Sequence, residues 1–248
     1  MPPLETLILL VTLTFVLAGT VKGVTGMGLP TVAMGLLGLL MAPAQAAALL
    51  LIPSLITNLW QFAAGPSRLM LMRRMAPMLL AIGLATWLAA GFLTGADPAW
   101  ATAALGLALI AYAALGFARL DVAIPKASEA WLSPLIGATT GIVTGATGVF
   151  VIPAVPYLQG LGLAKDDLVQ ALGLSFTAST LALAAGLVSH GALHLAGSGA
   201  SLLCTAPALA GMFLGQKLRA AVNAQTFRRL FFIGLLLLGA DLVARGIL

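Results

Sequence analysis

Residues 19–30 read GTVKGVTGMGLP, and residues 141–153 read GIVTGATGVFVIP. Three glycines and one threonine of the first stretch recur in the second at a constant offset of 122, and the closing prolines agree after one inserted residue. Weaker matches follow at similar offsets, Gln45 with Gln170 and Gly91 with Gly215. A pattern repeated over this length predicts that the chain is an internal duplication.

The composition excludes a water-soluble protein. Of the 248 residues, 61% are apolar and 8% are charged, against about 25% charged in an ordinary soluble domain. Uncharged stretches such as 23–67, 130–164 and 168–216 are each longer than the roughly 20 residues that one membrane-spanning helix needs. We therefore expect an all-α polytopic membrane protein that lies almost entirely in the lipid bilayer.

We expect ten helical segments, five in each repeat. Two of them are too short to span a bilayer at a rise of about 1.5 Å per residue, and each follows one of the duplicated stretches. Each repeat should therefore begin with a broken-helix hairpin that dips into the membrane and returns. The expected segments are 5–22, 30–41, 44–64, 75–96, 98–118, 131–144, 153–163, 167–189, 199–216 and 227–246. This places repeat one at 1–118, a cytoplasmic connection at 119–130 and repeat two at 131–248.

The basic residues predict that the two repeats are inverted. In repeat one they follow the third segment, at 68–74, whereas in repeat two they follow the fourth, at 217–229. If each hairpin returns to the side it entered from, each repeat crosses three times and the second repeat lies upside down. Ten of the twelve basic residues then face the cytoplasm, whereas eight simple crossings would place six there. We therefore expect both termini outside.

Helix breaks at matching positions of two inverted repeats predict a transport site. Broken helices leave backbone N–H and C=O groups unpaired, which is tolerated only where protein or a watery cavity surrounds them. The helices that begin near Pro30 and Pro153 would direct their first N–H groups toward this site. Because helix starts attract anions, we expect the substrate to be a small anion.

The candidate binding residues come from the duplicated turns and from the flanking helices. Glycines allow tight turns and close approach of the backbone, threonines add hydroxyl donors, and an intramembrane lysine is a functional candidate. The alternatives are helix packing by the glycines, hydroxyls that bond their own helix, and a lysine that snorkels to the interface. The predicted substrate-binding residues are Lys22, Gly23, Thr25, Gly26, Met27, Gly28, Asn58, Gly145, Thr147, Gly148, Val149, Ser175 and Ser179.

The paired motifs G-x-x-x-G-x-T-G resemble those of the sulfite exporter TauE/SafE family, and the duplication extends the resemblance over nearly the whole chain. The resemblance implies a multi-pass secondary transporter of the bacterial inner membrane for sulfite, sulfonates or sulfonated organic acids, with export as the expected direction. Repeat two departs from the pattern, because Phe150 stands where repeat one has Gly28. An anion channel and a transporter of non-sulfur organic anions are the alternatives, and the anion and the coupling ion stay open.

No enzyme, cofactor or metal site is predicted. The chain has no G-x-x-x-x-G-K-[ST] loop for ATP and no membrane-embedded cluster of Asp, Glu or His for catalysis or metal binding. The net charge of +5 follows from the positive-inside bias and does not indicate nucleic-acid binding. The expected partners are the small anion and the lipid bilayer, without nucleic acid or an ATP-binding partner, and a homodimer is left open.

The inverted topology predicts that Ser198 is accessible from outside the cell and that Ala224 is not. A cysteine at Ser198, in a background that lacks Cys204, should react with an impermeant thiol reagent added to intact cells, whereas a cysteine at Ala224 should not. Labelling after lysis serves as the control for reactivity of both sites. The opposite pattern in intact cells would contradict the inverted topology.

Overall fold

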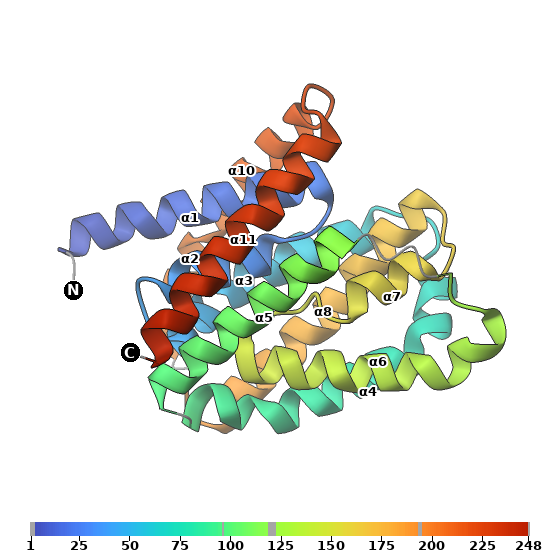
Figure 1. The fold of residues 1–248 in the computed structure, drawn as a ribbon, viewed down its shortest axis with the longest axis horizontal. Helices are drawn as coiled ribbons and strands as arrows, with labels where there is room; N and C mark the ends of the chain where they lie inside the picture. Colours follow the sequence, from blue (N-terminus) through green and yellow to red (C-terminus); the bar gives the residue numbers. More distant parts are fainter. Residues whose placement is uncertain (1–2, 96, 119–122, 193–194, 248) are drawn as a thin grey trace.

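The long apolar stretches of the sequence form helices. The computed structural model describes residues 3–95, 97–118, 123–192 and 195–247, and these residues form a bundle of eleven helices (Figure 1). The helices are α1 (Leu4–Thr25), α2 (Leu29–Gly38), α3 (Pro43–Ala63), α4 (Arg68–Gly95), α5 (Pro98–Ala118), α6 (Lys126–Thr147), α7 (Ala154–Gly160), α8 (Lys165–Ser189), α9 (Leu195–Leu203), α10 (Thr205–Leu218) and α11 (Ala224–Ile247).

Seven segments of the described chain are long and apolar enough to cross a membrane. They are α1, α3, α4, α5, α8, α11 and the stretch Gly199–Leu218, which contains the end of α9 and the whole of α10. The prediction of an all-α polytopic membrane protein is thereby confirmed.

Two helices begin earlier than expected, in stretches that contain charged residues. Helix α4 begins at Arg68 rather than at 75, and α6 begins at Lys126 rather than at 131. Arg, Lys, Leu and Met are good helix formers, and long basic side chains can reach water from a helix end, so charge does not stop these helices. Residues 126–130 of the expected connection are therefore helical, and residues 119–122 lie outside the described residues.

Proline and glycine shorten two other segments. The expected helix 199–216 is interrupted at Cys204 between α9 and α10, because Pro207 has no N–H to donate to the carbonyl of Leu203 and its ring crowds that carbonyl. The expected helix 153–163 is reduced to the seven residues of α7. Its chain turns away at Gly162, which has a φ of 64°.

A proline inside α3 fixes the position of α9. Pro53 cannot donate to the carbonyl of Leu49, and the hydroxyl of Ser201 from α9 donates to that carbonyl instead at 2.9 Å. The same hydroxyl accepts the N–H of Ile52 at 3.2 Å. A backbone group freed within the bundle is thus satisfied by a neighbouring helix, as the bilayer requires.

Equivalent helices of the two repeats make equivalent contacts. Helix α1 packs against α10, and its counterpart α6 packs against α4, while α3 packs against α8 and α5 against α11. In Figure 1, α1 and α6 run in opposite directions across the view, and the two chain ends are marked on the same side. That the two halves are inverted repeats stays a prediction, as does the orientation of the repeats relative to a membrane.

Glycines of the duplicated motif form these helix contacts. Gly19 and Gly23 lie against the backbone of α10, and Gly141 and Gly145 lie against the backbone of α4. A Cβ atom at Gly145 would lie 2.5 Å from the carbonyl oxygen of Thr86. The prediction that Gly23 and Gly145 form turns is therefore wrong. Both lie within helices, where small residues spaced four apart let two backbones approach each other.

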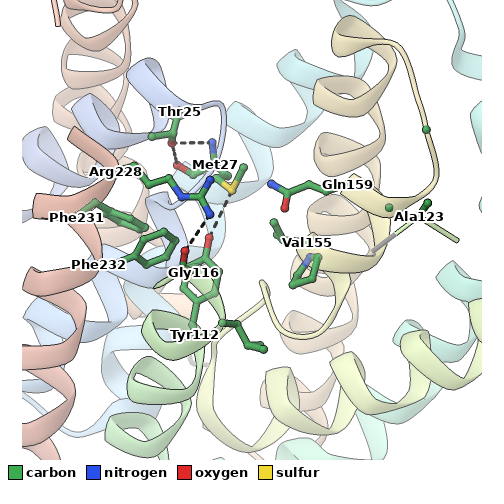
Figure 2. Close-up of a pocket in the computed structure, with 14 residues that line it drawn as sticks. Thr25, Met27, Tyr112, Gly116, Ala123, Val155, Gln159, Arg228, Phe231 and Phe232 are labelled. Carbon is green, nitrogen blue, oxygen red and sulfur yellow. Dashed lines mark hydrogen bonds between the residues drawn. The ribbon is translucent and has the colours of Figure 1, made fainter. Parts of the chain in front are cut away.

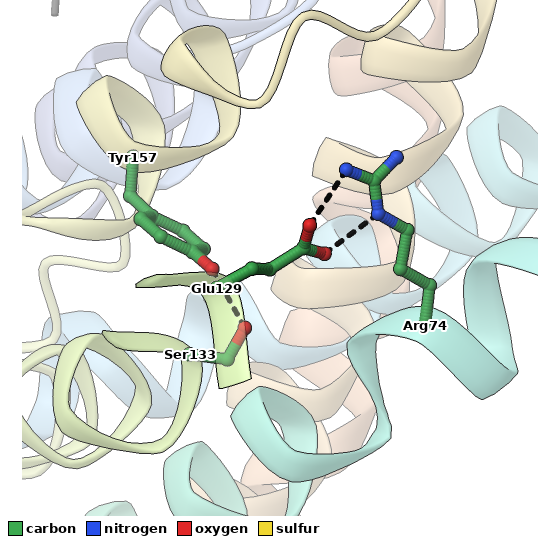
Figure 3. A network of polar contacts seen from close by, with 4 residues as sticks. All are labelled: Arg74, Glu129, Ser133 and Tyr157. Atoms are coloured by element: carbon green, nitrogen blue, oxygen red, sulfur yellow. Dashed lines mark hydrogen bonds and ion pairs between the residues drawn. The ribbon is translucent and has the colours of Figure 1, made fainter. Parts of the chain in front are cut away.

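Polar contacts join α4, α6 and α7 (Figure 3). Arg74 forms a bidentate ion pair with Glu129, with Nε at 2.6 Å from Oε1 and Nη2 at 2.8 Å from Oε2. One turn along α6, the hydroxyls of Ser133 and Tyr157 are hydrogen-bonded at 2.7 Å. Bidentate pairing fixes the relative orientation of its two partners. The first turn of α6 is thereby held against α4, and α7 against α6.

The glycine contacts predict that replacing a glycine by alanine destabilises the protein where the glycine contacts another helix, and not where it contacts none. Gly145→Ala should destabilise the protein by about 1 to 3 kcal/mol, because the added methyl group would force α6 away from α4. Gly234→Ala is the matched control, since a Cβ atom there would meet nothing within 4 Å and alanine favours the helix by about 1 kcal/mol. Thermal unfolding of the detergent-solubilised variants measures both. Equal melting temperatures would contradict the assigned packing.

Candidate functional site

The two duplicated motifs end their helices in the same way. Gly26 follows α1 with a φ of 80°, and Gly148 follows α6 with a φ of 71°. Both values lie in the left-handed region that glycine adopts without a steric penalty. In each turn a threonine hydroxyl, that of Thr25 or Thr147, accepts the backbone N–H two residues onward at 3.2 Å. The repeated motif therefore encodes a helix terminator.

The hydroxyl protons of these two threonines are used within their own motifs. Thr25 donates to the carbonyl of Val21 at 2.8 Å, and Thr147 donates to the carbonyl of Val143 at 2.6 Å. A hydroxyl has one proton to donate. In this structure both threonines therefore act as helix caps, which is the alternative that the sequence left open for membrane hydroxyls.

The two turns have different surroundings. We call the turn at Gly26 turn one and the turn at Gly148 turn two. In turn one, the carbonyl of Gly26 accepts a hydrogen bond from Gln61 Nε2 at 2.8 Å, and Gln61 Nε2 also donates to the carbonyl of Val169 at 2.9 Å. Turn two is fully buried at Val149, and a Cβ atom at Gly148 would lie 2.7 Å from the terminal methyl carbon of Met34. Turn one is thus tied to α3 and α8, whereas turn two packs against α2.

A pocket of about 560 Å³ opens between turn one and helices α5, α7 and α11 (Figure 2). Arg228 lies at this pocket, where its guanidinium donates to the carbonyl of Gly116 at 2.9 Å and stands 5.7 Å from the ring centre of Phe232. The hydroxyl of Tyr112 lies 3.4 Å from the sulfur of Met27. The pocket is lined by Thr25, Met27, Tyr112, Leu115, Gly116, Ala123, Val155, Pro156, Gln159, Gly160, Gly162, Arg228, Phe231 and Phe232.

The pocket contains two of the predicted residues and several that the sequence did not reveal. Thr25 and Met27 were predicted from the motif, and Gly28 lies next to them as the residue that precedes α2. Arg228 was assigned only to a cytoplasmic connection, because a basic residue near a helix start follows the positive-inside bias. Nothing in its sequence neighbourhood distinguishes Arg228 from Arg229.

The predicted lysine is buried and faces α3. Lys22 is 3% exposed, and its Nζ lies 3.1 Å from the hydroxyl oxygen of Thr57. It also donates to the amide oxygen of Asn58. Neither of the two ion pairs found among the described residues includes Lys22. A buried lysine with only neutral partners is costly to charge, and an anion beside it would offset that cost.

Eight buried side-chain atoms have no hydrogen-bond partner in the described protein, and four of the donors among them lie on α3 and α8: Ser54 Oγ, Asn58 Nδ2, Ser175 Oγ and Ser179 Oγ. The other four are Thr31 Oγ1, Gln61 Oε1, Thr86 Oγ1 and Thr140 Oγ1. The two donors on α3 are four residues apart, as are the two on α8, so each pair shares one helix face. The two helices pack together, and a Cβ atom at Gly173 would lie 3.0 Å from the carbonyl oxygen of Asn58. All groups of these two pairs can donate hydrogen bonds, and an unpaired buried group costs about 1 to 3 kcal/mol.

Two of the unpartnered groups lie at matching positions of the duplication. Ser54 and Ser179 differ by 125 positions, the same offset that relates Gln45 to Gln170. Both serines are fully buried. The duplication signal could therefore have singled out Ser54, which is absent from the predicted set. We refer to Lys22, Ser54, Asn58, Ser175 and Ser179 as the buried polar cluster.

A bundle of membrane-length apolar helices that buries a lysine and unpartnered hydrogen-bond donors is typical of a membrane transport protein. The family model for the sulfite exporter TauE/SafE matches residues 11–242, nearly the whole chain. The chain belongs to this family, as its paired motifs predicted. Searches of curated proteins and of solved structures gave no match.

The buried polar cluster predicts substitutions that leave stability intact. Ser54→Ala and Ser179→Ala should change the free energy of unfolding by less than about 0.5 kcal/mol or increase it, because neither hydroxyl has a hydrogen bond to lose. Gln170→Ala is the contrasting variant, since the Gln170 amide bonds the carbonyls of Phe62 and Gly65 and the N–H of Ser67.

The loss of these bonds should cost about 2 kcal/mol or more. Thermal unfolding in detergent compares the three variants. A serine variant as unstable as Gln170→Ala would show that its hydroxyl does have a structural partner.

Proposed function

We propose that this protein is a secondary transporter that exports a small sulfur-containing anion, such as sulfite, a sulfonate or a sulfonated organic acid, across the bacterial inner membrane. Membership of the sulfite exporter TauE/SafE family supports transport of this class of anion. The observation that carries the proposal is the buried Nζ of Lys22, which has only neutral partners among the described residues.

The buried polar cluster is the proposed binding site. A sulfite or sulfonate group has three oxygens that accept hydrogen bonds, and the cluster offers four unpartnered donor groups and a lysine that is a cation when protonated. Hydrogen bonds to ionised groups are roughly twice as strong as neutral ones. Lys22 would therefore provide most of the affinity, and the serine and asparagine donors would orient the anion.

The pocket beside Arg228 is the proposed entrance to this site. The exposed guanidinium of Arg228 attracts anions, and the wall of the pocket includes Thr25 and Met27 of turn one. Gln61 links turn one to α3, the helix that carries Asn58 and Ser54. A movement of turn one would therefore act on both the entrance and the binding site, which is the coupling that alternating access requires.

A carrier is favoured over an anion channel by the burial of Lys22. A channel needs a continuous water-filled path, whereas Lys22 is 3% exposed and does not line the pocket at Arg228. An anion bound at Lys22 would be occluded in this conformation. Saturable uptake with slow turnover in liposomes would agree with a carrier.

The proposed role of Lys22 predicts a specific loss of affinity. Lys22→Gln should weaken anion binding by roughly ten- to over a hundredfold, because a charge-assisted bond worth about 1.5 to 3 kcal/mol is lost. Lys22→Arg should keep part of the affinity. Lys217→Gln, at an exposed position of α10, is the matched control for the loss of one positive charge.

The measurement is calorimetric titration of purified protein with a panel of sulfite, methanesulfonate, sulfoacetate and simple carboxylates. Wild-type affinity of Lys22→Gln for every bound anion would remove Lys22 from the site. Tightest binding of a carboxylate would favour the alternative of a non-sulfur organic anion.

A further inference from the structure

Lys22 is the one basic side chain that is fully buried among the described residues. The helices around it supply no counter-ion. Helices α2 and α3 contain no titratable residue, and Lys217 of α10 is exposed. On α8, Asp166 is exposed, and neither Asp166 nor Asp167 belongs to an ion pair of the described residues, while Asp241 of α11 is paired with Arg245. On α11, Arg228 and Arg229 are exposed, and on α5 the hydroxyl of Tyr112 is directed at the sulfur of Met27. The described protein around Nζ therefore supplies no charge that would stabilise an ammonium.

The hydrogen bonds of Lys22 match a neutral amine. An ammonium group has three protons to donate, whereas a neutral amine has two protons and one lone pair. Among the described residues, Nζ has two acceptors within hydrogen-bond distance, the hydroxyl oxygen of Thr57 and the amide oxygen of Asn58. A third proton would have no acceptor, so both the desolvation and the bonding of Nζ favour the uncharged amine.

We propose that Lys22 takes up a proton when the anion binds and returns it to water when the anion leaves, so that the anion and the proton cross the membrane together. The proposal rests on the proposed function and adds the coupling ion to it. An anion beside Nζ stabilises the ammonium and supplies an acceptor for the third proton. By thermodynamic linkage, protonation of Lys22 must strengthen anion binding by the same factor.

Cotransport determines the charge that moves in each cycle. A monovalent anion and one proton cross as a neutral pair, so the membrane potential does no work on the cycle. The proton gradient and the anion gradient then set the direction together. A carrier whose cation keeps its proton throughout would instead move one net negative charge per anion.

Methanesulfonate is the appropriate probe, because its sulfonate stays ionised throughout the working range whereas sulfite titrates near neutral pH. For the wild-type protein, the dissociation constant should rise about tenfold per pH unit once Lys22 of the anion-free protein is neutral. Binding in weakly buffered solution at such a pH should remove close to one proton per anion from the medium. In liposomes, an imposed potassium diffusion potential should leave the flux unchanged.

Lys22→Arg is the matched variant, because a guanidinium stays protonated. It should bind methanesulfonate with an affinity that does not change between pH 6 and pH 9, take up no proton, and carry a flux that responds to the diffusion potential. Proton uptake by the wild-type protein tests the proposal without any variant, should the arginine protein fail to fold.

The outcomes separate the coupling from the proposed function. Wild-type binding of methanesulfonate with constant affinity and no proton uptake would overturn the coupling and leave anion transport standing. Failure of the wild-type protein to bind any anion of the panel would overturn both.

Discussion

Direct contact between helix backbones at glycine is the constraint on which the rest of this structure depends. Apolar side chains gain nothing by leaving lipid for one another, so helices in a bilayer associate through close packing and polar contacts. Here Gly19 and Gly23 place no side chain between α1 and α10. In the same way, Gly141 and Gly145 place none between α6 and α4. The same interlocking pair is made twice, and α3 with α8 fills the space between the two pairs.

This packing decides where Lys22 points. Successive residues of an α-helix are about 100° apart, so a helix whose Gly19 and Gly23 face α10 turns Lys22 away from α10. The side chain meets Thr57 and Asn58 of α3. In repeat two the equivalent position is Thr144, whose hydroxyl donates to the carbonyl of Val149 at 3.2 Å. The same position of the motif is thus a lysine in repeat one and, in repeat two, a threonine that caps the end of its helix.

Much of the fold could be predicted, because duplication and hydropathy are properties of the sequence alone. Lys22 and Asn58, both in the predicted set, are in contact in the structure, and Ser175 lies on the helix that packs against Asn58. The roles of Gly23 and Gly145 could not be assigned in advance, because a glycine pattern is the same for a turn and for a helix contact. The pocket at Arg228 was missed for a related reason, since only tertiary structure brings α5, α7 and α11 to turn one.

The difference between Lys22 and Thr144 has a consequence for the transport cycle. With inverted repeats built from identical halves, the inward-facing and outward-facing states would be related by a two-fold rotation about an axis in the membrane plane and would have equal energy. In the proposed transporter, a lysine in one half alone would make them unequal, so the unloaded protein would favour one of the two states and the half-saturation concentrations on the two sides would differ. Such asymmetry cannot drive net movement, which needs a gradient. It does allow uptake and release to be tuned separately by substitutions in a single repeat.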